Sequence, residues 1–170
     1  MLVIGIDPGT AITGYGLVRG EPGGALEAVD WGVILTPAKT PIAERLDQIY
    51  TSLNEILKEH QPEEAAVEAI FFQKNVKTAM SVGQARGVVL LALQRAGLAA
   101  SDYSPNEIKQ AVSGYGGADK QQVQSMVKAL LNLKETPKPD DAADALAVAI
   151  CHLHTANTPA RLESAGSPND

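Results

Sequence analysis

The chain has 170 residues, a length that suits one domain with a sizeable hydrophobic core. Its composition is that of an ordinary globular protein, and its single cysteine, Cys151, excludes an internal disulfide bond and is typical of a reducing cytosol. The first residues lack the basic start and long apolar run of a signal peptide, and no apolar stretch is long enough to span a bilayer. These features predict a cytoplasmic protein without membrane contact.

The net charge of −6 argues at first against a nucleic-acid partner, but the charge is unevenly distributed along the chain. Residues 69–134 contain eight lysines and arginines and only three acidic residues, so this segment is basic and the remainder strongly acidic. The local field of a binding surface matters more to a polyanion than the total charge does. The middle of the chain can therefore bind nucleic acid, although an ordinary solvated surface would have the same composition.

Hydrophobic patterning predicts alternating strands and helices over most of the chain. The expected strands are residues 2–7, 13–18, 25–36, 65–68 and 98–103. The expected helices are residues 41–60, 78–96 and 105–113, with two more that start at about residues 120 and 140. The polar, proline-containing residues 157–170 are expected to form a disordered tail after a single domain of residues 1–156.

Three antiparallel strands followed by strand–helix alternation indicate an α/β fold whose five-stranded mixed sheet is flanked by helices. The expected strand order is 3-2-1-4-5. This order places the first strand in the centre of the sheet, which explains why Leu2, Val3, Ile4 and Ile6 make it apolar on both faces.

Acidic residues are expected to meet where two neighbouring strands end. Asp7 ends the first strand and Glu68 ends the fourth, its predicted parallel neighbour. Asp144 lies on one helix face with Asp141, three residues away, and the spacing of four from Asp140 would serve equally well. Grouped carboxylates repel one another unless a cation neutralises them, and oxygen ligands select Mg²⁺ or Mn²⁺, two of which can promote displacement at phosphorus. The other interpretations are that Asp7 accepts hydrogen bonds from turn amides or is solvated, and that Asp140 caps the helix.

Five motifs follow one another in the order found in the RuvC family of bacterial Holliday junction resolvases, which the chain resembles to about His154. They are "GIDPGT", "TGYG", "VEAIFFQKN", "GQARG" and "DDAADALAVAICH". The resemblance implies an RNase H-like fold, a homodimer, and cleavage of four-way DNA junctions with divalent metal, with two ions expected per active site. The family's catalytic and metal-binding tetrad falls on Asp7, Glu68, Asp141 and Asp144. The resemblance thus makes the choice between Asp141 and Asp140, and a substitute-ligand role for Asp140 stays open.

The resemblance also implies residues that contact DNA and the partner subunit. The DNA-binding set comprises Phe71, Lys74, Lys77, Arg86, Lys109 and Lys120. Without the family, Phe71 and Phe72 would be interpreted as core residues and the lysines as solvated, while an ion pair is an equal alternative for Arg86. Ala79, Gly83 and Gly87 form a stripe of small residues at a spacing of four, which allows close approach to the sheet or to a partner helix. The resemblance favours the dimer, and the RuvA–RuvB branch-migration complex is a further candidate partner.

The predicted function is therefore a structure-selective endonuclease that resolves four-way DNA junctions in recombination and repair. Another RNase H-like nuclease acting on RNA or on other branched DNA is the related alternative. An ATP-binding protein of the actin and sugar-kinase group also carries Asp-x-Gly-Thr after a strand, but 170 residues leave no room for its second lobe. A catalytically silent junction-binding module is disfavoured because all four acidic residues are present.

Overall fold

The computed structural model describes residues 1–21, 24–70 and 75–156 and contains one five-stranded sheet in the order β3-β2-β1-β4-β5. The strands are β1 (Leu2–Asp7), β2 (Ile12–Gly20), β3 (Leu26–Leu35), β4 (Glu64–Glu68) and β5 (Ala100–Tyr103). β1 pairs antiparallel with β2 and parallel with β4, β2 pairs antiparallel with β3, and β4 pairs parallel with β5. The predicted mixed sheet with its first strand in the centre is confirmed.

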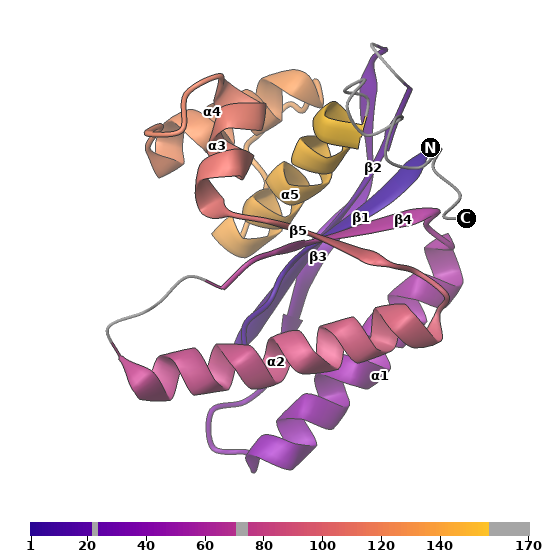
Figure 1. Ribbon diagram of the computed structural model, residues 1–170, viewed down its shortest axis with the longest axis vertical. Coiled ribbons are helices and arrows are strands. Elements are labelled where there is room, and N and C mark those ends of the chain that lie inside the picture. The colour runs from indigo at the N-terminus through magenta and orange to yellow at the C-terminus, as the bar shows by residue number, and fades with distance from the viewer. Residues whose placement is uncertain (22–23, 71–74, 157–170) are drawn as a thin grey trace, which may run out of the picture.

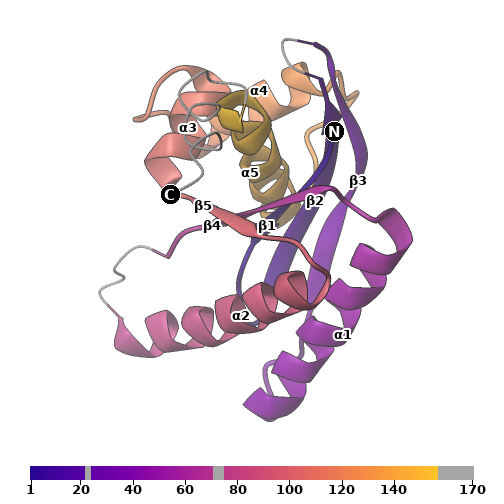
Figure 2. The ribbon, with the colours of Figure 1, turned by 45° about the vertical axis from the view of Figure 1, so that its right-hand side comes forward.

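Helices cover both faces of this sheet (Figure 1). They are α1 (Ile42–His60), α2 (Val76–Arg95), α3 (Pro105–Ser113), α4 (Lys120–Leu130) and α5 (Asp140–Ala156). The first two lie on one face and the last three on the other, and the same layers are visible after a turn of 45° (Figure 2). Among the described residues, no helix combines the length and apolar character needed to cross a membrane.

The start of α2 and the start of β5 differ from the predicted boundaries. α2 begins at Val76, before the expected residue 78, because the Asn75 side chain accepts a hydrogen bond from the Lys77 amide and caps the helix. β5 begins at Ala100, after the expected residue 98, because the chain first turns through Gly97 at a φ of +79°. Helix capping and turn formation thus determine where these two elements begin. Hydrophobic periodicity alone predicted that the elements exist but not their first residues.

Each face of the sheet has its own hydrophobic core. Alternate residues of β1, among them Ile4, pack with α1 and α2, whereas Val3 packs with α5 on the other face. Between Ala142 and Leu153 every residue of α5 is buried except Asp144, as expected for a helix that is apolar all round and covered on all sides. Truncating a fully buried residue such as Ile4 to alanine would cost about 2–5 kcal/mol.

Two glycines allow α5 to approach the sheet closely. A Cβ atom at Gly5 would lie 2.2 Å from the main-chain oxygen of Ala145, and one at Gly14 would lie 2.0 Å from that of Asp141. Any larger residue would push the helix away. Because Gly14 is paired with Asp7 in the β1–β2 ladder, this contact places the first turn of α5 beside the end of β1.

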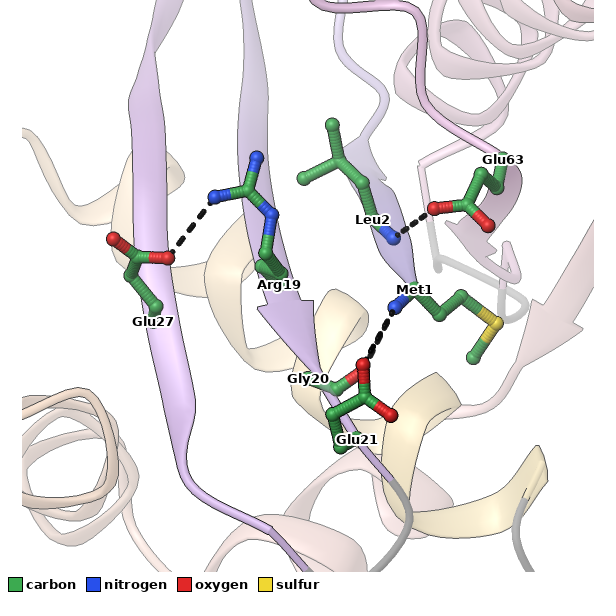
Figure 3. A network of polar contacts seen from close by, with 7 residues as sticks. All are labelled: Met1, Leu2, Arg19, Gly20, Glu21, Glu27 and Glu63. Atoms are coloured by element: carbon green, nitrogen blue, oxygen red, sulfur yellow. Dashed lines mark hydrogen bonds and ion pairs between the residues drawn. The ribbon is translucent and has the colours of Figure 1, made fainter.

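The opposite end of β1 is fixed by polar contacts around the N-terminus (Figure 3). The Met1 ammonium group donates to the Gly20 carbonyl at 3.0 Å, and the Leu2 amide donates to Glu63 Oε1 at 2.9 Å. These bonds join β1 to β2 on one side and to the start of β4 on the other. They hold the register that carries Asp7 to the other end of the strand.

Candidate active site

Strand alternation and register together place Asp7 and Glu68 side by side. Ile6 faces α1 and α2, so the next residue, Asp7, lies on the α5 side of the sheet. Ile6 is paired with Val67 in the parallel β1–β4 ladder, which places Glu68 beside Asp7 at the end of the neighbouring strand. The predicted proximity of these two side chains, at the ends of neighbouring strands, is confirmed.

The environment of Asp7 strongly favours its protonated form. Burial, together with the negative charges of Glu68, Asp144 and Asp141 and a hydrogen bond to Glu68, raises the pKa of Asp7 from 3.8 to about 9. Asp7 therefore keeps its proton at neutral pH, which removes one of the negative charges from this group of carboxyl side chains. The structure therefore brings the four predicted acidic residues into one electrostatic group.

A lysine compensates part of this negative charge. Burial raises the pKa of Asp144, while the nearby Lys120 ammonium group opposes that shift. Lys120 Nζ lies 3.4 Å from Asp144 Oδ2 and 3.4 Å from Asp140 Oδ2. Burial acts to lower the pKa of Lys120, but the two aspartates raise it above its ordinary value, so this ammonium group stays charged.

Asp140 is directed toward α4. Its side chain is 61% exposed, compared with 31% for Asp144, and Gln124 Nε2 donates to Asp140 Oδ1 at 3.1 Å. Asp141, in contrast, is one of the charges that raise the pKa of Asp7. The contacts thus separate two aspartates that helical spacing alone could not, and the capping role of Asp140 stays a prediction.

A pocket of about 250 Å³ opens beside these carboxylates. Its lining includes Glu68 and Asp144 together with Lys109 and Lys120. Cavities of about 790 and 420 Å³ lie along α3 and α4, but neither is lined by any of the four acidic residues. The smaller pocket combines carboxylates with two cationic side chains, an arrangement suited to an anionic substrate.

Within residues 1–21, 24–70 and 75–156, no three His, Cys, Asp or Glu side chains are arranged to hold a metal ion. The four acidic side chains are gathered, but the proton on Asp7 and the Lys120 ammonium group relieve their repulsion. A cation that bound here would have to replace that proton. The site is thus a group of four candidate metal ligands in which Asp7 carries a proton.

The other predicted DNA-contact residues lie in varied surroundings. Lys77 is exposed in the first turn of α2, whereas the Arg86 side chain is 21% exposed and forms an ion pair with Asp102. The ion pair left open for Arg86 is thus present. Phe71 and Lys74 lie outside the described residues.

The small-residue stripe on α2 faces away from the sheet. A Cβ atom at Gly83 or Gly87 would meet nothing within 4 Å, whereas Ala85 and Val89 of the same helix are buried in the core. Exposed apolar side chains extend the stripe, namely Val76, Met80 and Leu91. The glycines therefore do not serve to pack α2 on its own sheet.

Sequence reasoning missed the role of Thr10 in the "GIDPGT" motif. Its hydroxyl donates to the main-chain oxygen of Ser81 at 2.6 Å and is nearly inaccessible to solvent. Gly14 of "TGYG" could have indicated the close approach of α5, but the partner of Thr10 had no local signal.

The histidines of α5 have protein partners. His152 is buried, with Nδ1 2.9 Å from the Tyr103 hydroxyl and Nε2 in contact with Glu64, and His154 Nδ1 lies 2.9 Å from the Ala111 carbonyl. These contacts tie both histidines to neighbouring parts of the protein.

A mixed sheet of this order, with acidic side chains where β1 and β4 end and a further acidic pair on the helix packed across them, defines the RNase H-like class. Residues 3–152 match the family described as "Crossover junction endodeoxyribonuclease RuvC". The chain belongs to the RuvC family, and its enzyme class is that of a crossover junction endodeoxyribonuclease.

Relatives of known name support this assignment over nearly the full length. The chain is 58% identical to the RuvC of Desulfitobacterium hafniense, over 92% of this chain and 94% of that protein, and 57% identical to that of Chloroflexus aggregans, over 93% and 96%. The structure of Thermus thermophilus RuvC in complex with Holliday junction substrate is similar with a TM-score of 0.85, at 37% identity over 92% and 95%. The yeast mitochondrial Holliday junction resolvase Ydc2, 17% identical with a TM-score of 0.63 over 91% and 80%, shares the fold.

Proposed function

We propose that this protein resolves four-way DNA junctions by paired, metal-dependent hydrolysis of phosphodiester bonds. The observation that carries the proposal is the gathering of Asp7, Glu68, Asp141 and Asp144 beside a pocket that two lysines line. The similarity to a RuvC whose structure was solved with Holliday junction substrate supports the proposal that four-way junctions are the substrate. Action on DNA inside the cell also agrees with the predicted cytoplasmic location.

The donor set fits a hard divalent cation. Carboxylate oxygens are the ligands that Mg²⁺ and Mn²⁺ prefer, and the four acidic residues would hold two such ions. When bound, the ions supply an activated water and stabilise the departing oxygen of an in-line displacement. The chain's own contribution is to place Asp7 and Glu68 on rigid strand ends and Asp144 on a buried helix, so that binding a cation would require only their side chains to rearrange.

The pKa of Asp7 predicts how the stability of the cation-free protein depends on pH. With EDTA present, we expect the melting temperature to fall as pH rises from about 4 to about 9. Over this range unfolded Asp7 has lost its proton while folded Asp7 retains it, so this stabilisation is complete below pH 3.8 and is lost as pH approaches 9. Thermal melts across this range measure the effect.

Asp7→Asn should flatten this pH dependence, because asparagine does not titrate. Adding Mg²⁺ or Mn²⁺ should raise the melting temperature more at about pH 8 than at about pH 5, since the cation competes with the proton on Asp7. A melting temperature of the unmodified protein that rises between pH 5 and pH 8 in EDTA would contradict the protonated arrangement of the site.

The two pocket lysines should respond differently to substitution. Lys109→Ala should flatten the log–log salt dependence of junction binding by about 0.9, the effect of one lost phosphate contact. Lys120→Ala should change this slope less, because Asp140 and Asp144 already neutralise its charge, and should slow cleavage more. Junction titrations at several salt concentrations and cleavage time courses separate the two effects.

Lys58→Ala, an exposed position on α1, is the control and should leave both slope and rate unchanged. Equal slopes for Lys109→Ala and the unmodified protein would exclude Lys109 as a phosphate contact. Lys77 and Arg86, together with Phe71 and Lys74, are proposed as further DNA contacts.

We infer that the protein is a homodimer formed through α2. The exposed stripe of Ala79, Gly83 and Gly87 and its apolar neighbours can approach a second copy closely. A two-fold dimer carries one site per protomer, which suits the near two-fold symmetry of a four-way junction. A contact with the RuvA–RuvB branch-migration complex is part of the same proposal.

The substrate is tested by incubating the protein and Mg²⁺ with a synthetic four-way junction, a plain duplex and an RNA–DNA hybrid. Preferential nicking of the junction is expected. Preferential cutting of the hybrid would favour the other RNase H-like nuclease activity.

A further inference from the structure

A buried pair of hydroxyl groups joins the loop after Asp7 to α2. Thr10 is 6% exposed, and its Oγ1 donates to the Ser81 carbonyl at 2.6 Å and lies 2.5 Å from Ser81 Oγ. Because the threonine hydroxyl has one proton, which the carbonyl accepts, the Ser81 hydroxyl is the donor in the second bond. The pair therefore makes two hydrogen bonds between segments that are 71 residues apart.

The loop that carries Thr10 is itself fixed to the body of the protein. The Thr36 hydroxyl donates to the Thr10 carbonyl at 2.5 Å, and Arg45 Nε donates to the Thr36 hydroxyl at 2.9 Å. Within the loop, the Thr13 hydroxyl donates to the Gly9 carbonyl at 2.6 Å. Thr10 thus presents its hydroxyl from a rigid support.

Ser81 lies where α2 leaves the hydrophobic core. The buried residues of α2 begin at Ala85, whereas Val76 and Met80 are 71% and 63% exposed. In Figures 1 and 2 the beginning of α2 extends past the ends of the strands. Polar contacts such as those of Ser81 therefore contribute much of what holds the first turns of the helix against the sheet.

We propose that Thr10 and Ser81 form a positioning pair that holds the first turns of α2 in a fixed place relative to Asp7. The proposal rests on the proposed function, because these turns carry Lys77 and follow the segment containing Phe71, both proposed to contact DNA. The pair links the residues that hold the junction to the residue that ends β1, so that the phosphate to be cut lies at the carboxylates.

A graded series of variants tests the pair. Thr10→Val removes both hydrogen bonds at nearly constant volume, Ser81→Ala removes one, and Thr10→Ser retains both. We expect the cleavage rate of pre-bound junction to fall about tenfold in Thr10→Val, about threefold in Ser81→Ala and less than about twofold in Thr10→Ser. Junction affinity should change less than about threefold in each variant, because misplaced reacting groups slow the chemical step more than they weaken binding. Hydrogen exchange of residues 76–84 should accelerate in the same order, with no junction present.

Thr155→Val is the control, since it removes a threonine hydroxyl that donates within α5 to the Cys151 carbonyl at 2.7 Å. It should leave the exchange of residues 76–84 unchanged. Unchanged exchange in Thr10→Val, or a Thr10→Ser protein as slow as Thr10→Val, would overturn the proposal. If the unmodified protein cuts no junction, the proposed function fails, whereas the exchange series still decides whether the pair holds α2.

Discussion

Replacing Asp144 with asparagine is expected to lower the cleavage rate of a bound four-way junction by about 10²–10³-fold, equivalent to the several kcal/mol that a metal ion contributes to a transition state. Asp144 is the one residue between Ala142 and Leu153 of α5 that is not buried, and it lines the pocket with Glu68. Asparagine keeps its shape but removes a charge that a cation would need. Junction binding should therefore persist while cleavage is lost.

Asp140→Asn is the matched control four residues earlier on the same helix. Asp140 is exposed and contacts Lys120 and Gln124. Replacing it with asparagine should therefore reduce the cleavage rate by less than about threefold. Single-turnover rates with pre-bound junction give the comparison. Equal loss in both variants would show that Asp140 also acts as a ligand, and near-normal turnover of Asp144→Asn would remove it from the catalytic set.

Gly83→Arg is expected to convert the proposed dimer into monomers and to abolish paired cleavage. A Cβ atom at Gly83 would meet nothing within 4 Å in one chain, so the folded protomer should tolerate arginine. In a closely packed helix pair, the same charge would be buried without a partner at a cost of several kcal/mol. The dimer dissociation constant should then rise by at least about 10²-fold.

Analytical ultracentrifugation measures the dissociation constant, with Glu55→Arg on the exposed face of α1 as the control. Thermal melts should show a folded Gly83→Arg protein, because replacing a helical glycine stabilises the helix by up to about 1 kcal/mol. A Gly83→Arg protein that remains dimeric would place the interface elsewhere.

The central sheet and the pairing of Asp7 with Glu68 could be predicted from sequence because they depend on periodic signals. Alternation along β1 gives the face of Asp7, and the parallel crossover to β4 places Glu68 on the next strand at the same edge. The register matters because a slip of one residue would turn Asp7 away from α5 and toward the core beneath α1 and α2.

Contacts between distant segments could not be predicted in this way. The choice between Asp141 and Asp140 depends on where α4 lies, and α4 is placed by packing that helical spacing does not encode. The bonds of Thr10 to Ser81 join a turn and a helix that have no common periodicity. The family resemblance supplied the choice of Asp141 over Asp140, but the bonds between Thr10 and Ser81 became visible only in the folded chain.

The most direct measurement uses a supercoiled plasmid whose inverted repeat extrudes a four-way junction. A dimer that cuts both strands within one binding event converts this plasmid directly to the linear form in Mg²⁺, and a matched plasmid without the repeat stays supercoiled. We expect linear product from the unmodified protein and none from Asp144→Asn. Accumulation of singly nicked circles from the unmodified protein, or equal cutting of both plasmids, would contradict paired resolution of junctions.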